Sequence, residues 1–162
     1  MTVISTTPDT ATLTMTIVAD LAAPPKRAWQ VWADPRQLER WWGPPTWPAT
    51  FVTHDLVVGG GSSYYMTGPD GEKAHGWWRF LVIDEPHTLE FEDGFADEEG
   101  TPNPSMPVIV GRVALTEAPG GTRMTIVSTF ADLEQMEQLV AMGMVEGMTA
   151  AMGQIDEILA AG

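Results

Sequence analysis

The sequence contains no cysteine, and only 8 of its 162 residues are lysine or arginine. Without cysteine the chain can form no disulfide, no thiolate metal site and no cysteine nucleophile. The scarcity of basic residues matters because proteins bind phosphate backbones through clustered lysine and arginine side chains. The few basic residues are scattered along the chain and form no basic stripe. Nucleic acid is therefore not expected as a partner.

Long apolar runs are also missing. No run approaches the roughly 18–20 apolar residues of a membrane-spanning helix, and residues 1–9 have neither the basic start nor the apolar stretch of a signal peptide. We therefore expect no membrane insertion and a cytoplasmic location. The 22 acidic residues give a net charge of −14, which we interpret as a contribution to solubility rather than as an acidic docking face.

The chain does contain a regular series of short segments separated by proline and glycine turns. Residues 12–20 alternate between polar and apolar side chains, which predicts a strand with one buried face. Residues 24–33 and 35–42 predict two short helices, divided at Asp34-Pro35, with Asp34 as the N-cap of the second. Six further strands are predicted at residues 49–58, 62–67, 72–84, 88–93, 108–117 and 122–131.

The C-terminal segment predicts one long amphipathic helix. Asp132 and Gln135 have the spacing of a capping box, and apolar residues then follow at steps of three and four as far as Leu159. At ~1.5 Å per residue this helix would be roughly 40 Å long. The predicted class is α+β with a helix-grip fold, in which a curved antiparallel sheet of about seven strands wraps around the C-terminal helix. Residues 12–162 are expected to form this single domain after a flexible lead over residues 1–11.

Several strings carry a resemblance to a known family. They are Ala23-Pro24 with Val31-Trp32, Asp34-Pro35 through Leu38 to Trp41-Trp42, Asp55 with Val58-Gly59-Gly60, Gly68-Pro69-Asp70-Gly71, Gly76, Pro86 with Leu89, and Gly121-Thr122-Arg123. In their order and spacing the chain resembles the START-like superfamily, also called SRPBCC or birch-pollen-allergen-like, over residues 13–159. Within it, the chain is most similar to homologues of the activator of heat-shock-protein ATPase.

The resemblance implies a hydrophobic pocket between the sheet and the final helix. Members of the superfamily include ligand carriers, polyketide cyclases, aromatases and co-chaperone domains, so the fold alone does not determine the function. The chain departs from this branch at Gly147-Met148, where a Gly-Trp pair is common. Methionine adapts to irregular space, and this exchange is expected to alter the floor of the pocket.

The strand predicted over residues 72–84 has two faces of different polarity. We assign the more apolar face, which carries Trp78 and Phe80 together with Ala74, Gly76 and Val82, to the concave side of the sheet. Arg79 would then lie outside, opposite Glu90 or Glu92 of the next strand. The reverse assignment would place His75 and Arg79 in the pocket, where they could bind an anionic head group.

An apolar or amphipathic small molecule is the expected partner of this pocket. The methionines of the C-terminal stripe form a core face that would also give the pocket a soft, adaptable wall. The residues that we expect to contact the ligand are Tyr64, Met66, Trp78, Phe80, Ile126, Ser128, Met144, Met148 and Met152.

Seven tryptophans are present, and five of them fall within residues 29–47. Their simplest interpretation is core packing of the two short helices against the sheet. A second interpretation is an aromatic gate at the pocket mouth, formed by Trp29, Trp32, Trp41 and Trp42.

Catalytic candidates are few: Asp55, His75 and Tyr64. Asp55 has a structural alternative, in which it holds the Gly59-Gly60-Gly61 turn by accepting backbone N–H bonds. His54 and Asp55 are neighbours on a predicted strand and so point to opposite faces, where they cannot pair. No nucleophile elbow, phosphate loop or metal-binding motif is present, so neither a metal nor a cofactor is expected.

These observations favour a non-enzymatic small-molecule binding protein. The alternative is an enzyme of the cyclase, aromatase or hydrolase type that uses polar groups of the same cavity. A third option is a co-chaperone or stress-response partner. A homodimer, formed through edge strands or the tryptophan-rich helices, is compatible with the sequence.

Overall fold

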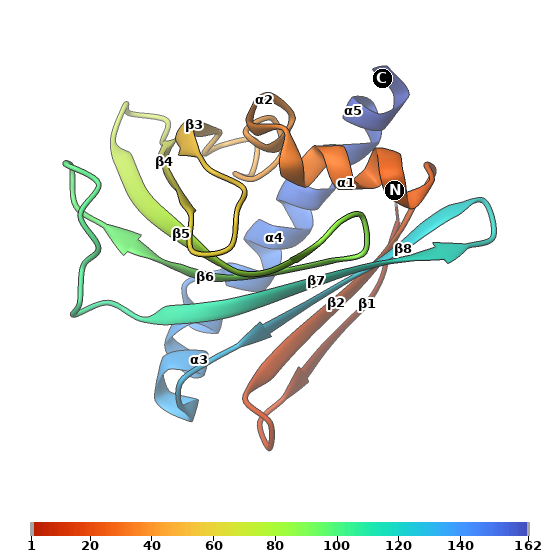
Figure 1. Cartoon of the computed structure of the whole chain (residues 1–162). Coiled ribbons are helices and arrows are strands. Elements are labelled where there is room, and N and C mark those ends of the chain that lie inside the picture. Colours follow the sequence, from red (N-terminus) through yellow and green to blue (C-terminus); the bar gives the residue numbers. More distant parts are fainter. Residues whose placement is uncertain (1, 162) are drawn as a thin grey trace.

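The protein, described here for residues 2–161 by a computed structural model, contains one eight-stranded antiparallel sheet (Figure 1). The strand order is β1-β2-β8-β7-β6-β5-β4-β3, so the N-terminal hairpin lies beside the last strand. The strands are β1 (Thr2–Asp9), β2 (Thr14–Leu21), β3 (Ala49–His54), β4 (Gly61–Thr67), β5 (Lys73–Asp84), β6 (Thr88–Ala96), β7 (Val108–Ala118) and β8 (Gly121–Thr129).

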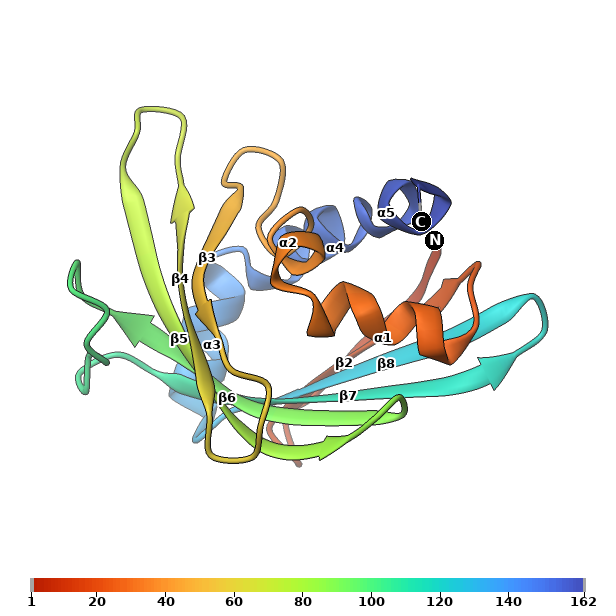
Figure 2. The ribbon, with the colours of Figure 1, turned by 45° about the horizontal axis from the view of Figure 1, so that its top comes forward.

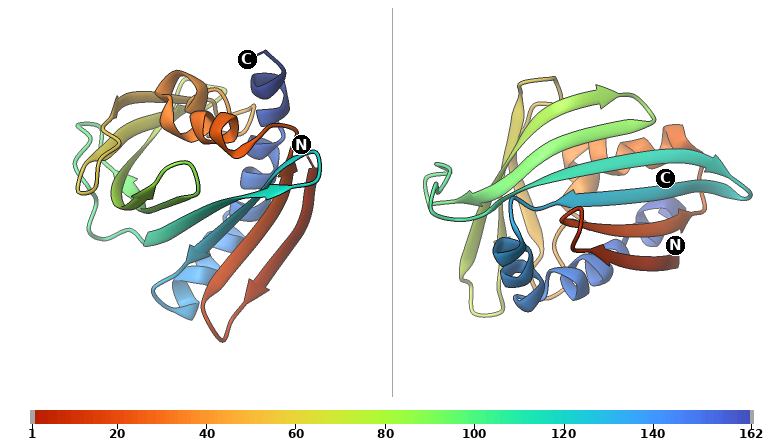
Figure 3. Two further views of the ribbon diagram at one scale, coloured as in Figure 1. Left: turned by 45° about the vertical axis from the view of Figure 1, so that its right-hand side comes forward. Right: turned by 90° about the horizontal axis from the view of Figure 1, so that it is seen from below.

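The sheet curves strongly, and the helices lie inside the curve (Figures 2 and 3). The short helices α1 (Pro25–Ala33) and α2 (Pro35–Leu38) cover one end of the concave side, and the C-terminal helices cross it. This arrangement confirms the α+β helix-grip class, with eight strands in place of about seven.

The additional strand is β1, which corrects the prediction of a flexible lead over residues 1–11. It pairs antiparallel with β2, for example through Thr7 and Thr16. Most of its side chains are exposed, so the segment carries no alternation of buried and exposed residues, and backbone hydrogen bonds hold it on the sheet edge. The part of this prediction that concerns Met1 lies outside the described residues.

The C-terminal helix is also different from the prediction, because it is divided into α3 (Leu133–Ala141), α4 (Met144–Met152) and α5 (Ile155–Ala161). The first break is at Gly143, whose φ of +91° suits glycine. At the second break, Gln154 Nε2 donates a hydrogen bond of 2.7 Å to the carbonyl of Gly43. The N-terminus of α3 is as predicted, since Asp132 Oδ1 accepts from Gln135 N at 2.8 Å.

None of the helices within residues 2–161 combines the length and the apolar character of a membrane span.

Strand β5 has the predicted faces only along part of its length. Trp78 and Phe80 are buried and Arg79 is exposed, opposite Glu92. A bulge between Phe80 and Val82 then changes the alternation, so that Val82 is exposed, contrary to the prediction.

Other boundaries differ by a few residues. Strand β3 ends at His54 rather than at residue 58, and α2 ends at Leu38, with turns continuing to residue 42. Strand β6 extends to Ala96, past the predicted end at residue 93.

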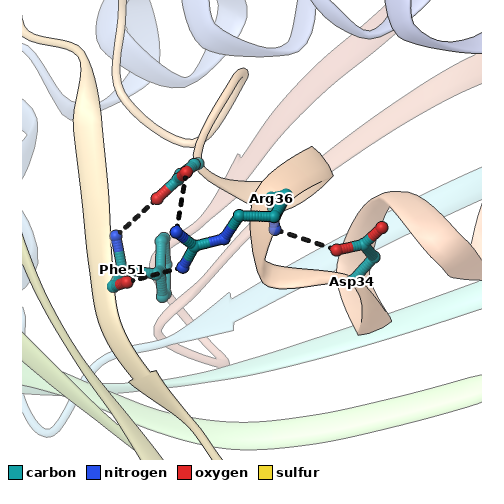
Figure 4. Close-up of polar contacts among 4 residues, drawn as sticks. Asp34, Arg36 and Phe51 are labelled. Carbon is teal, nitrogen blue, oxygen red and sulfur yellow. Dashed lines mark hydrogen bonds and ion pairs between the residues drawn. The ribbon is translucent and has the colours of Figure 1, made fainter.

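Polar contacts fasten α2 to β3 (Figure 4). Asp34 caps α2, because its Oδ1 accepts from Arg36 N at 2.9 Å. Arg36 Nη2 donates to the carbonyl of Phe51 at 2.9 Å, while the N–H of Phe51 donates to Glu39 Oε2 at 2.9 Å. An ion pair of 3.4 Å between Arg36 and Glu39 completes the group.

The burial of the C-terminal methionines predicts unequal costs of truncation. Met152 has no exposed surface, whereas Met148 is only half-buried. We expect Met152→Ala to lower the free energy of unfolding by about 2–5 kcal/mol, because it opens a closed cavity in the core. Met148→Ala should cost about 1 kcal/mol or less. Urea denaturation of both variants would check this, and equal losses would contradict the observed helix register.

Candidate functional site

A cavity of about 330 Å³ lies between the concave face of the sheet and the start of the C-terminal helices. Strands β4 to β8 form one wall, and α3, α4 and the Gly143 turn form the other. Its lining is mostly apolar and includes Met66, Phe91, Ile109, Ile126, Leu139, Met144 and Met148. The polar side chains that reach it are Tyr64, His75, Asp93 and Ser128, together with the indoles of Trp32 and Trp42.

Tyr64 and Asp93 form a polar pair inside this cavity. They belong to β4 and β6, which are separated by β5. The Tyr64 ring crosses β5 over Gly76, where a Cβ atom would lie 2.5 Å from the Tyr64 hydroxyl oxygen. The hydroxyl then donates a hydrogen bond of 3.0 Å to Asp93 Oδ1. A glycine at position 76 is therefore needed for the pair to form.

Burial changes the ionisation of both groups. It raises the pKa of Asp93 to about 7, against the opposing effects of the Tyr64 hydroxyl and the nearby Trp78 indole. Near neutral pH the carboxyl is therefore present in both its protonated and its ionised form. Burial, and then the charge of Asp93, raise the pKa of Tyr64 well above its ordinary value. The phenol consequently keeps its proton and remains a hydrogen-bond donor.

Aromatic rings pack against Tyr64. The centroid of Trp42 lies 6.4 Å from that of Tyr64 and 6.4 Å from that of Phe91, with interplanar angles of 89° and 70°. Rings that meet at such steep angles form a corner rather than a flat wall. The indole nitrogens of Trp32 and Trp42 have no hydrogen-bond partner among residues 2–161.

The four tryptophans proposed as a gate fall into two groups. Trp32 and Trp42 line the cavity. Trp29 and Trp41 are fully buried away from it, and Trp41 Nε1 donates to the carbonyl of Val31 at 2.8 Å. All four side chains are buried. Packing in the core explains the positions of Trp29 and Trp41, whereas Trp32 and Trp42 are also placed where they can contact a ligand.

The residues expected to contact a ligand also fall into two groups, those in the core and those at the cavity wall. Trp78, Phe80 and Met152 do not line the cavity and lie in the core behind it. Trp78, for example, stacks on Phe91 with 4.3 Å between ring centroids. Phe91 lines the cavity and Trp78 does not. The remaining predicted residues lie at the cavity wall, namely Tyr64, Met66, Ile126, Ser128, Met144 and Met148.

Of the catalytic candidates, Asp55 lies outside the cavity. Its side chain is exposed, and it is the backbone that holds the glycine turn, where Asp55 N donates to the Gly61 carbonyl at 2.8 Å. His75 reaches the cavity wall and contacts the ring of Tyr65, with 5.6 Å between centroids. Tyr64 is the candidate that the structure places in a polar pair.

His54 has a structural role. One ring nitrogen lies 2.7 Å from Ser62 Oγ and the other 3.0 Å from the carbonyl of Trp32. Burial lowers its pKa, which favours the neutral ring. It therefore links α1 to β3 and β4 and does not line the cavity.

Asp93 is the polar site residue that the sequence analysis missed, and Phe91, Ile109 and Leu139 are apolar lining residues that it also missed. A signal was available, because Leu89, Phe91, Asp93 and Phe95 occupy alternate positions of one strand. With Leu89 and Phe91 buried, the alternation places a carboxyl on the concave face. The strand predicted over residues 88–93 ends at Asp93, and without Phe95 the alternation is too short to mark this carboxyl as part of the concave face. Over residues 2–161, no three histidine, aspartate or glutamate side chains are grouped so as to hold a metal ion.

Comparison with known proteins gives both close relatives and a family. A sequence profile described as "Activator of Hsp90 ATPase homolog 1-like protein" matches residues 22–160. A crystal structure from Mycobacterium smegmatis has 51% sequence identity and a TM-score of 0.91, covering 99% of each chain. A solution structure from Arthrobacter aurescens has 55% identity and a TM-score of 0.94, covering 99% of this chain and 94% of that one. No curated protein matches.

The burial of Asp93 predicts a specific pH dependence of stability. Because its pKa rises from 3.8 to about 7 on folding, the folded state holds a proton that the unfolded state releases. The contribution of this group is therefore most favourable below about pH 4 and is lost as pH rises to about 7, by about 4 kcal/mol. Asp93→Asn removes the ionisation and keeps the shape of the side chain.

The measurement is urea denaturation of wild type and variant between about pH 4 and about pH 8. Relative to wild type, Asp93→Asn should gain stability as the pH rises, whereas Asp70→Asn, at an exposed position, should show no such gain. Parallel curves for wild type and Asp93→Asn would show that the carboxyl is not buried as described.

Proposed function

We propose that this chain, which belongs to the Activator of Hsp90 ATPase homolog 1-like family, binds an apolar or amphipathic small molecule in the cavity between its sheet and its C-terminal helices. The observation that carries the proposal is the composition of this cavity. Its walls are mostly apolar side chains, and its few polar groups include the hydrogen-bonded pair of Tyr64 and Asp93. A largely apolar cavity with a small number of placed polar groups is typical of small-molecule sites.

The size of the cavity supports a ligand of modest dimensions. Its volume of about 330 Å³ falls near the lower end of the range for small-molecule pockets, roughly 300–1,000 Å³. Each 100 Å² of apolar ligand surface removed from water would contribute about 2.5 kcal/mol, before the cost of association is subtracted. Met66, Met144 and Met148 have flexible side chains that can adapt to different shapes.

One observation favours a second function, that of an enzyme. A carboxyl with a pKa of about 7 inside a cavity is suited to general acid–base catalysis near neutral pH, and Tyr64 would assist as a hydrogen-bond donor. The reaction class would be a proton transfer within a bound apolar molecule, as in a cyclase or an aromatase.

A small molecule recovered from the purified protein would test the enzymatic function. Native mass spectrometry followed by denaturing extraction identifies such a compound, which is then incubated with fresh protein. Conversion by wild type and not by Asp93→Asn would support catalysis. A compound that is recovered unchanged after prolonged incubation would support binding alone.

The binding function predicts stabilisation by ligand that depends on cavity volume. A lipophilic compound at a hundredfold excess over its Kd should raise the free energy of unfolding of wild type by about 2.7 kcal/mol. Met148→Trp places a larger ring at the cavity wall and should reduce this stabilisation. Ala150→Trp, at an exposed position of α4, is the matched control and should leave it unchanged.

The measurement is thermal denaturation of the three proteins with a panel of lipophilic compounds. If no compound stabilises wild type, or if both tryptophan variants respond as wild type does, the cavity is not the binding site.

A further inference from the structure

We propose that the ligand of this cavity is an amphipathic organic cation, whose positive charge lies beside the Asp93 carboxyl among the rings of Trp42, Tyr64 and Phe91. This inference rests on the binding function proposed above and specifies the chemical class of the ligand.

The first argument is electrostatic complementarity. Among the residues that line the cavity, the ionisable side chains are Tyr64, His75 and Asp93, and none of the lysines or arginines of the chain reaches it. Asp93 forms no ion pair with any residue from 2 to 161. The carboxyl therefore lies in the cavity wall, partly exposed to the cavity and without a positive partner. A charge that is largely removed from water is costly unless it is paired. A ligand cation would supply the missing partner.

The second argument is the aromatic corner. Cations are attracted to the faces of tryptophan, tyrosine and phenylalanine rings, and aromatic cages recognise alkylated ammonium groups in this way. Trp42 meets Tyr64 and Phe91 at interplanar angles of 89° and 70°, with 6.4 Å between centroids in both pairs. All three rings line the same cavity as Asp93. A carboxyl combined with several ring walls is a suitable environment for an ammonium group, and an anionic ligand would be repelled from it.

The rest of the cavity determines the other half of the ligand. On the side of the helices it is lined by Leu139, Met144 and Met148, and on the side of the sheet by Ile109 and Ile126. These side chains offer no hydrogen bonds, so the part of the ligand that lies against them is expected to be apolar. His75 and Ser128 are the other polar side chains of the sheet that reach the cavity.

The test compares three probes with one carbon skeleton: phenylbutylamine, phenylbutanol and phenylbutyrate. They carry a positive charge, no charge and a negative charge at neutral pH. Calorimetric titration at about pH 8 should show the amine binding at least about tenfold more tightly than the alcohol, and the butyrate most weakly. In Asp93→Asn the advantage of the amine should disappear while the affinity for the alcohol is kept.

The pH dependence adds a second readout. Protonation of Asp93, whose pKa is about 7, removes the negative partner, so the affinity for the amine should fall by up to about tenfold for each pH unit below about pH 7. Amine binding near that pH should also release a proton, which is measured by repeating the titration in buffers of different ionisation enthalpy. Tyr64 keeps its proton throughout. Because the imidazole of His75 can gain charge in the same range, the series is repeated with His75→Gln, where the dependence should persist.

The outcomes separate this inference from the proposed function. Equal affinities for amine and alcohol, or an amine affinity that Asp93→Asn leaves unchanged, would overturn the cationic ligand and leave the binding function intact. An affinity for the alcohol that rises as the pH falls would show instead that protonated Asp93 donates to a neutral oxygen. If none of the three probes binds and no lipophilic compound stabilises the protein, both proposals fail.

Discussion

Trp32 lies where the two short helices, the sheet and the cavity meet. Its ring packs edge-on against Trp41 with 4.7 Å between centroids, and it also contacts Trp42 at 5.9 Å and Phe91 of β6 at 6.1 Å. Aromatic pairs favour these separations, and each ring buries roughly 150–250 Å². This packing holds α1 and the turn after α2 against the concave face. Trp42, which forms one wall of the cavity, is positioned by the same contacts, so the shape of the site depends on them.

Several glycines lie beside this aromatic cluster and shape the cavity. Gly76, Gly94, Gly111, Gly143 and Gly147 all contribute to the cavity lining. At Gly76 the missing side chain gives room to the Tyr64 ring, and at Gly143 the positive φ ends α3 and redirects the chain into α4. At Gly147, in α4, an added Cβ atom would meet no other atom within 4 Å, so a larger side chain there has room on the helix side of the cavity.

Much of this arrangement is predictable from the sequence, because periodicity and turn residues act locally. The alternation in β2, the N-caps Asp34 and Asp132 and the apolar stripe from Met136 to Ile155 all correspond to observed features. Strand β1 was missed because backbone pairing on a sheet edge requires no burial pattern. The division between Phe91 at the cavity and Trp78 behind it depends on how two strands pack together, which no local pattern contains. Asp93 was missed for a different reason: it is the last residue of the predicted strand, and only the extension of β6 past it to Phe95 shows that it alternates with apolar residues on one face.

The position of Asp93 is difficult to explain by stability alone. The chain has 22 acidic residues and a net charge of −14, so its solubility does not depend on one more carboxyl inside the fold. An amide of the same shape could accept the hydrogen bond from Tyr64 without the cost of burying a charge. Ionisable groups with strongly perturbed pKa values are concentrated at functional sites. Under the proposed function, a complementary group of the ligand would offset the free energy that burial of this carboxyl costs. A ligand that supplied such a group would then bind more tightly than its apolar contact area alone would provide.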